Sequence, residues 1–289
     1  MASYNILTLS EPVTDFVATT SPATINLQCG LMEDAQRKKV YAVYKAGEMP
    51  QHPYDGVRVE MEVMLGFPLS ELPVGTIVKL IEGGTPTDYI IVHQGLPSGI
   101  YDASCDGTWL LRKDIYETRQ WHSSQLNDWA NSTLKAYLDS TFLARFESSI
   151  QDAIKQVKIP YRPGSGTSGT VNSGANGLSC KVFLLSGYEV GTVTTSQNLP
   201  PDGACLSYFA GTAATDAKRI AYLSGKAVTW WLRSPSTLNA LNAWSVILNG
   251  SCDYIGCSNS TGVRPACVLP SDLLVSSTPN PDGSFNPIL

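Results

Sequence analysis

The chain has 289 residues, of which 43% are hydrophobic and 16% are charged, and its formal net charge at pH 7 is -5. This length favours two domains, and the hydrophobic content is enough for each to bury a core. The acidic balance, without any run of Lys or Arg, argues against a nucleic-acid partner. No apolar run reaches membrane-spanning length, so we expect no membrane insertion.

Residues 1–66 are predicted to form a small all-β sandwich. Segments such as YNILTLS, ATINLQC and GVRVEMEV alternate β-branched, aromatic and polar residues, with turn residues between them. The order VTDFVATTSPATINLQC, then VYAVYKAGEMPQHPYDG, resembles the fibronectin type III-like modules of phage tail proteins. Such modules act mainly as spacers. The Trp usual after the second strand is missing, because Gln28 and Cys29 stand there.

Residues 67–289 are predicted to form a second domain, entered through LGFPLSELPVG. TIVKLIEGG and TDYIIVHQG predict a hairpin, and GTWLLRKDIY predicts a further strand. Apolar residues at helical spacing in SSQLNDWANSTLKAYLDSTFLARF predict a helix capped by Ser123 or Ser124. A second short helix is expected at about 147–156.

The rest of the second domain is predicted to hold a loop and a cluster of strands. The Gly/Ser-rich segment 161–177 is a loop without a phosphate-binding motif. KVFLLSGYEVG, KAVTWWLRS, AWSVILNG and VRPACVL are predicted strands. Strands, two helices, long loops and then more strands indicate an α+β fold class.

We find no catalytic or metal-binding pattern. The three His residues (52, 93 and 122) are not spaced with Cys or carboxylates as metal ligands are, and no nucleophile-elbow, zincin or paired-carboxylate motif occurs. Glu189 is interpreted as a strand-face or ion-pair residue. The seven Cys are scattered without a CxxC pair, which favours free thiols. We therefore expect no enzyme activity, no metal and no cofactor.

Residues 236–261 have an unusual composition. Lys, Glu, Gln and Met occur throughout residues 1–226 but nowhere from Ala227 to Leu289. If AAC or AAT codons were randomised at their adenines, they could encode Asn, Ser, Thr, Ile, Asp, Gly, Ala, Val, Leu, Tyr and Cys. Every residue of 236–261 except Trp244 belongs to that set. An ordinary Ser/Asn-rich loop is the alternative explanation.

The frame around this window resembles a known family. WWLRSP, AWSV and GVRPA are similar to the C-terminal part of the variable proteins of diversity-generating retroelements. GTWLLRKDIYETRQWHSS, LNDWANSTLKAYLDSTFL, IKQVKIPYRPGSGT and DGACLSYF resemble a domain of unknown function frequent in gut bacteria and their phages. The resemblance covers roughly residues 70–272. It implies a C-type lectin-like fold with a variable binding face at about 230–266.

The resemblance also implies roles for individual residues. Large or rigid frame residues would hold the backbone, whereas variable side chains would contact the ligand, with Tyr254 the best single candidate because aromatic residues dominate binding hot spots. The frame residues are Trp230, Trp231, Arg233, Trp244, Gly262 and Arg264. The ligand-contacting residues are Ser236, Leu238, Asn239, Leu241, Asn242, Ser245, Ile247, Leu248, Ser251, Asp253, Tyr254, Ile255, Ser258 and Asn259.

Three functions remain open at this point. The first is a phage or prophage tail adhesin that recognises a host cell-surface protein or glycan. It would be located in the virion tail, attached to other tail proteins through the N-terminal module, and a homotrimer is a plausible assembly. It would be made in the host cytoplasm, because MASYNILTLSEPVTDF lacks the features of a signal peptide. The second is a bacterial surface adhesin. The third is a catalyst related to formylglycine-generating enzymes, using Cys252 and Cys257.

Overall fold

The computed structural model describes residues 66–164, 169–192, 199–211 and 217–289, and the backbone of three strands at 32–34, 39–43 and 60–64. The chain divides into two compact units. One consists of residues 1–67 and 276–278, and the other of residues 68–275 and 279–289.

The described part of the first unit is a three-stranded antiparallel sheet. Its strands are β1 (Met32–Asp34), β2 (Lys39–Val43) and β3 (Glu60–Met64), in the order β1-β2-β3. The predicted strand GVRVEMEV overlaps β3, and VYAVYK of the fibronectin-like pattern overlaps β2. The strands predicted within residues 1–30 lie outside the described residues, so the fibronectin-like sandwich stays a prediction.

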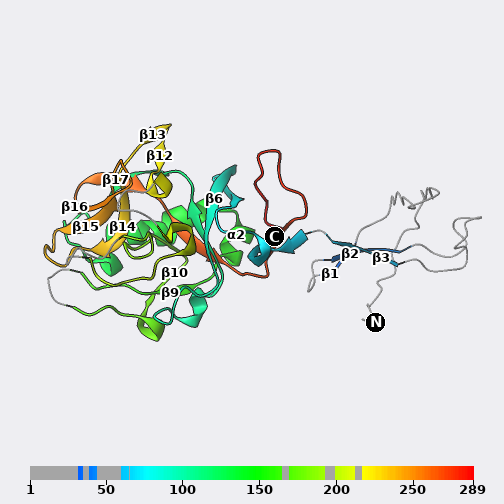
Figure 1. Ribbon diagram of the computed structural model, residues 1–289, viewed down its shortest axis with the longest axis horizontal. Coiled ribbons are helices and arrows are strands. Elements are labelled where there is room, and N and C mark those ends of the chain that lie inside the picture. Colours follow the sequence, from blue (N-terminus) through cyan, green and yellow to red (C-terminus); the bar gives the residue numbers. More distant parts are fainter. Residues whose placement is uncertain are drawn as a thin grey trace, which may run out of the picture. The chain divides into compact units, whose positions relative to one another are not determined.

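The second unit is built around two five-stranded sheets (Figure 1). The first, here called the β6 sheet, has the order β11-β18-β7-β6-β5. Its strands are β5 (Ile77–Glu82), β6 (Thr85–Gln94), β7 (Thr108–Arg112), β11 (Val182–Phe183) and β18 (Ala266–Leu269). The antiparallel register of β5 on β6 confirms the predicted hairpin. Alternate residues of β5 are buried, whereas β6 is buried along the apolar run Tyr89 to Val92.

The second sheet, here called the β14 sheet, carries the window that the sequence singled out. Its order is β16-β15-β14-β17-β8, with β16 at one edge and β14 paired in parallel to β17. Its strands are β8 (Glu117–Gln120), β14 (Trp230–Pro235), β15 (Asn242–Val246), β16 (Cys252–Gly256) and β17 (Ser260–Val263).

Shorter strands complete the unit. β9 (Val157–Ile159) pairs with β10 (Leu178–Cys180), and β12 (Tyr222–Leu223) pairs with β13 (Lys226–Ala227). Strands β4 (Gly66–Pro68) and β19 (Leu274–Ser276) lie where the chain passes from one unit to the other.

The α+β prediction is wrong, because the described chain is β-rich with little helix. One continuous helical run contains α1 (Thr133–Tyr137), a π-helical turn and a 3-10 turn ending at Arg145. Helix α2 (Ser148–Ala153) is a short second helix. Within the described residues, no helix is long and apolar enough to cross a membrane.

The helix that we expected to begin at Ser123 or Ser124 begins nine residues later at Thr133. Its cap is Ser132, whose hydroxyl accepts a hydrogen bond from the backbone N–H of Lys135 at 3.0 Å. The preceding residues follow the helical apolar period but are used by tertiary contacts: Trp129 is buried and stacks on Trp121. Such contacts override local helix propensity.

The hydrophobic core joins the two large sheets. Trp109 of β7 packs edge-on against Phe183 of β11, with ring centroids 5.4 Å apart. The same core cluster contains Trp230, Trp244 and Val246 of the β14 sheet. One face of the β14 sheet is therefore anchored on large apolar side chains, and burial of several such residues contributes substantially to the free energy of folding.

Candidate functional site

The register of β14, β15 and β16 separates their side chains into two groups. Trp230 lies opposite Val246, and Trp244 lies opposite Tyr254. These side chains share the face that packs on the core, because alternate residues of a strand point to opposite faces. Asp253 and Ile255 occupy the intervening positions, and so they point to the other face.

The frame residues and the ligand-contacting residues differ in burial. All six frame residues are buried: Trp230, Trp231, Arg233, Trp244, Gly262 and Arg264. Of the fourteen ligand-contacting candidates, six are exposed: Leu238, Asn239, Leu241, Leu248, Asp253 and Asn259. Six are half-buried: Asn242, Ile247, Ser251, Tyr254, Ile255 and Ser258. Ser236 and Ser245 are buried, which makes them poor ligand contacts.

Tyr254 is positioned as a packing residue. Its ring meets the Trp244 ring edge-on, with centroids 5.5 Å apart, and it packs against the core cluster. Ser245 is also used internally, since its hydroxyl donates to the carbonyl of Asp253 at 3.1 Å. Neither side chain points freely at solvent, whereas Leu238 and Leu248 are 63% and 58% exposed.

Four of the candidates meet around one groove of about 410 Å³ on the β14 sheet. Ile247, Leu248, Ile255 and Asn259 line it together with residues that our candidate list did not include. These are Ala227, Val228, Thr229, Ser260 and Thr261. By contrast, Leu238, Asn239 and Leu241 belong to the loop between β14 and β15 and do not line this groove.

Asn127, which sequence reasoning missed, holds the loop between β14 and β15. Its side-chain amide donates to the carbonyls of Ser236, Asn239 and Asn242 at 2.9–3.0 Å. Its backbone N–H donates to the carbonyl of Ala240 at 2.8 Å. All four acceptors are main-chain atoms, so this support from Asn127 does not depend on the side chains of the loop. Within the loop, the Ser236 hydroxyl accepts from the Leu238 N–H at 3.3 Å and the Asn239 side chain accepts from the Leu241 N–H at 2.9 Å.

Arg219, also missed, holds the turn between β15 and β16 in the same way. Its guanidinium is buried and donates to the carbonyl of Gly250 at 3.0 Å. The other nitrogens donate to the carbonyls of Val190 and Gly191 at 2.7 and 2.9 Å. The guanidinium thus ties the turn to a distant loop through backbone atoms alone.

The turn between β16 and β17 has equivalent support. The backbone N–H of Trp121 donates to the carbonyl of Cys257 at 2.9 Å. The Gln120 amide donates to the carbonyl of Ser258 at 2.8 Å. No local sequence pattern points to Gln120, Asn127 or Arg219, because the carbonyls that their side chains bond are 28 or more residues away in the chain.

The frame residue Arg233 anchors β14 beneath this surface. Its guanidinium donates to both carboxylate oxygens of Glu189, at 2.5 and 2.6 Å, and to the carbonyls of Pro160, Leu184 and Asp202. Arg264 is buried over the Trp230 ring and donates to the carbonyl of Arg112 at 2.9 Å. Burial lowers the pKa of Arg264 to about 10.

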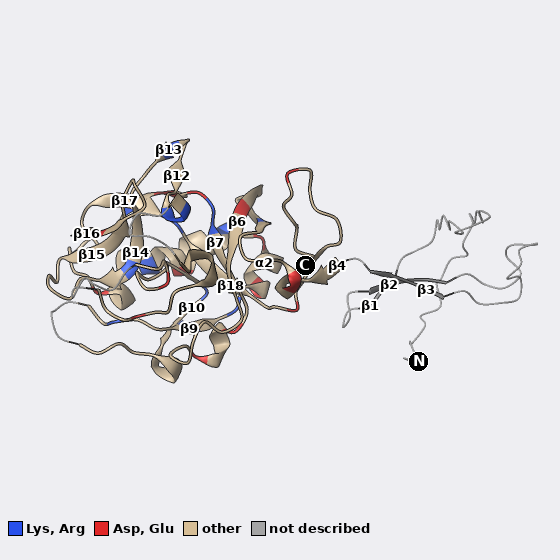
Figure 2. Ribbon diagram, viewed as in Figure 1, with Lys and Arg blue, Asp and Glu red and all other residues tan. Residues whose placement is uncertain are grey.

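The window carries little charge and no built metal site. Asp253 is its single ionisable carboxylate, and the ribbon of β15 to β17 is mostly uncharged (Figure 2). Across the described residues, no cluster of three or more His, Cys, Asp or Glu side chains could hold a metal ion.

Burial raises the pKa of Cys257 to about 12 and also raises the pKa of Cys252. Both thiols are therefore poor nucleophiles at neutral pH.

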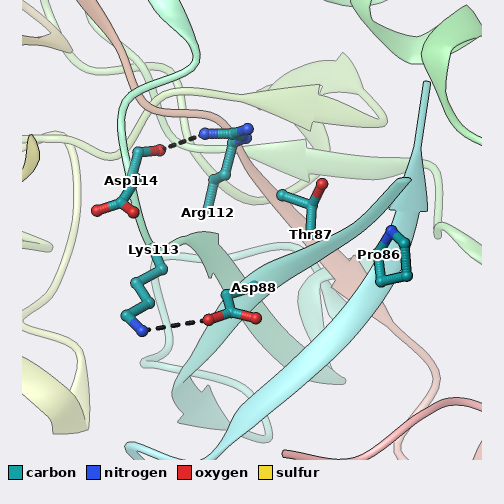
Figure 3. A pocket seen from close by; sticks show the side chains of 6 residues that line it. All are labelled: Pro86, Thr87, Asp88, Arg112, Lys113 and Asp114. Atoms are coloured by element: carbon teal, nitrogen blue, oxygen red, sulfur yellow. Dashed lines mark hydrogen bonds and ion pairs between the residues drawn. The ribbon is translucent and has the colours of Figure 1, made fainter. Parts of the chain in front are cut away.

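A second hollow of about 300 Å³ lies beside β6 and β7 (Figure 3). Three of its four charged residues are paired. Asp88 accepts from Lys79 at 2.9 Å and from Lys113 at 3.1 Å. Arg112 pairs with Glu82 at 3.0 Å and donates to the carbonyl of Asp114 at 2.8 Å.

Comparison with known proteins places most of the second unit in one family. No curated protein and no solved structure matches the chain. Residues 106–271 match a domain of unknown function, DUF6273, over more than half of the chain and across β14 to β17. The chain therefore belongs to the DUF6273 family.

Proposed function

We propose that this protein binds a ligand on the host-cell surface through residues 236–261, as the receptor-binding adhesin of a phage or prophage tail. In this proposal the window is a variable surface of the kind found in diversity-generating retroelement proteins. The first unit attaches the protein to other tail proteins, and three copies assemble. The ligand is a protein or a glycan.

One observation carries the proposal: all three connections of the window are held from outside through main-chain atoms. Asn127, Arg219 and Gln120 each donate to carbonyls of one connection. A carbonyl is present whatever the side chain, so substitutions there leave the support intact. A surface that changes its contacts while keeping its shape needs this arrangement.

The distribution of exposed apolar residues supports the same proposal. Among the large hydrophobic side chains of the described residues, the three most exposed are Leu238, Leu248 and Leu241, at 63%, 58% and 47%. All three lie in the window, Leu238 and Leu241 in the loop before β15 and Leu248 in the turn after it. Exposed apolar side chains at both ends of this strand favour the window over the rest of the described surface as the interaction site.

A catalyst of the formylglycine-generating type is less well supported. Cys252 lies in β16 and accepts a hydrogen bond from the Thr192 hydroxyl at 3.0 Å, and Cys257 is buried. The raised pKa of both thiols opposes thiolate chemistry. A bacterial surface adhesin would use the same face, and it differs from the preferred proposal only in where the protein is anchored.

The proposal is tested with two matched triple variants. One combines Leu238→Ser, Leu241→Ser and Leu248→Ser. The control combines Leu96→Ser, Leu126→Ser and Leu289→Ser, which are exposed leucines outside the window. Fluorescently labelled proteins are titrated onto a panel of intact gut-bacterial strains.

We expect the window variant to bind a recognised strain at least about tenfold more weakly than wild type. The control should bind like wild type, and both variants should keep the wild-type Tm, because exposed substitutions change stability by about 0.5 kcal/mol or less. Equal binding by the two variants would contradict the proposal.

A further inference from the structure

The groove on the β14 sheet is lined by two kinds of residue. The aliphatic ones are Ala227, Val228, Ile247, Leu248 and Ile255. The polar ones, with hydroxyl or amide groups, are Thr229, Asn259, Ser260 and Thr261. The groove therefore offers an apolar surface together with neutral hydrogen-bonding groups, within the size range of small binding sites.

The groove favours an uncharged occupant. Every described residue that lines it is neutral at pH 7. A charged group placed against Ile247 and Ile255 would lose hydration without gaining an opposite charge, which disfavours its binding. Anionic sugars and phosphorylated groups are thus disfavoured, whereas aliphatic side chains fit the aliphatic lining residues.

The lining also discriminates between neutral glycans and peptides. A sugar ring is best held by an aromatic ring that covers its C–H face, and no aromatic side chain is among the described residues lining the groove. Extended peptides present aliphatic side chains on one side and main-chain amides between them. Thr229, Asn259 and Ser260 can donate to and accept from such amides.

We propose that this groove binds an uncharged peptide segment of a protein partner, with an aliphatic side chain seated between Leu248 and Ile255 and main-chain amides bonded to the Asn259–Thr261 row. This inference rests on the proposed function, and it assigns the ligand to the protein class.

The test uses a displayed library of random dodecapeptides, selected on the full-length protein. Enriched peptides are synthesised with a fluorescent label, and their Kd is measured by anisotropy at 50 and 500 mM salt. Wild type is compared with Leu248→Asp and Ser260→Lys, both at exposed groove positions. Leu96→Asp, at a leucine that is 41% exposed outside the groove, is the matched control. A neutral-glycan array is probed in parallel with the same proteins.

We expect enriched peptides to contain aliphatic residues and few charges, and to bind with less than about a threefold change in Kd between the two salt concentrations. Both groove variants should weaken binding at least about tenfold, and Leu96→Asp should not. Peptides that bind all variants equally, or no enriched peptide at all, would overturn the inference.

The failure of this inference is distinguishable from failure of the proposed function. Glycan binding that Leu248→Asp abolishes would exclude the peptide class while leaving the window as a binding face. If the triple variant Leu238→Ser, Leu241→Ser and Leu248→Ser also bound cells like wild type, both this inference and the proposed function would be contradicted.

Discussion

Arg233 of β14 and Glu189 form a bidentate ion pair that is wholly buried. The two nitrogen–oxygen distances are 2.5 and 2.6 Å, and both side chains have 0% exposure. Glu189 also accepts from the Tyr101 hydroxyl at 2.8 Å and from the backbone N–H of Ser186 at 2.9 Å. The pair joins β14 to the 186–189 turn. Its contribution to the free energy of folding depends on both partners being present.

Arg233→Met should therefore destabilise the protein by about 3–5 kcal/mol, because it leaves the Glu189 carboxylate buried without a counter-charge. Urea unfolding followed by Trp fluorescence measures the change. The double variant Arg233→Met/Glu189→Leu should recover part of the loss, since it removes the uncompensated charge. A loss below about 1 kcal/mol for the single variant would show that the pair is not buried as described.

Asp202 should make the stability depend on pH. Its Oδ1 accepts from the Ser234 hydroxyl at 2.8 Å, while within the described residues its buried Oδ2 has no hydrogen-bond partner. Burial raises the pKa of Asp202 from its ordinary value of 3.8 to about 7, although the nearby Arg233 lowers it. The folded protein therefore binds a proton that the unfolded chain releases, and stability falls as the pH rises from about 4 to 7.

Asp202→Asn removes this proton-linked contribution. The free energy of unfolding of the variant minus that of wild type should rise by on the order of 2–4 kcal/mol from pH 4 to pH 8. Most of this rise should occur below pH 7. The difference between the two urea-unfolding curves at each pH isolates Asp202 from other titrating groups. A pH-independent difference would contradict the assignment.

Asn127→Ala should loosen the loop between β14 and β15. It removes the side-chain hydrogen bonds to the carbonyls of Ser236, Asn239 and Asn242. The carbonyl of Asn239 still accepts from the Asn242 N–H, and that of Asn242 from the Ser236 N–H. Each lost hydrogen bond costs about 0.5–1.5 kcal/mol, and a carbonyl left buried without a partner costs about 1–3 kcal/mol. We expect a total loss of about 2–4 kcal/mol and faster hydrogen exchange in residues 236–242. Leu238→Ser serves as the control, because its exposed side chain should change neither quantity. Unchanged exchange in Asn127→Ala would contradict main-chain support of the loop.

Tyr254→Ala should lower stability by about 1–3 kcal/mol, because the ring packs on Trp244. Tyr254→Phe keeps the ring and should retain most of the stability. Comparing Tm with binding to a recognised strain separates the roles of Tyr254. A large loss of binding with an unchanged Tm would restore Tyr254 as a direct ligand contact.

The parts of the fold that the sequence predicted well are those governed by local sequence patterns. The β5–β6 hairpin follows from two short β-branched and aromatic runs between Ile77 and Gln94, separated by the Gly83-Gly84 turn. The helix prediction was wrong from Ser123 to Ser132, because Asn127 and Trp129 are held by partners from elsewhere in the fold. The resulting chain is β-rich, and the α+β expectation had counted a longer helix than the tertiary contacts allow.

The sequence predicted where the candidate site lies in the chain, but it did not predict which of its side chains are buried. The window 236–261 stood out by its missing Lys, Glu, Gln and Met, and its leucines are the most exposed of the described chain. From the sequence, Tyr254 could not be assigned to the face that packs on the core, because this depends on the register of β15 on β16. Ser245 lies on the opposite face, where its burial depends on other parts of the fold. Asn127 and Arg219 carried no local signal, because each acts through carbonyls distant in sequence.

The most direct test of a variable binding face is the coding DNA. We predict a near-copy of the segment encoding residues 230–266 near a reverse-transcriptase gene, differing mainly where the copy has adenine. The differing codons should encode exposed or groove residues such as Leu238, Leu248, Ile255 and Asn259, and should spare the buried Trp244, Val246 and Cys257. The absence of a copy, or differences that fall equally on buried positions, would contradict the account.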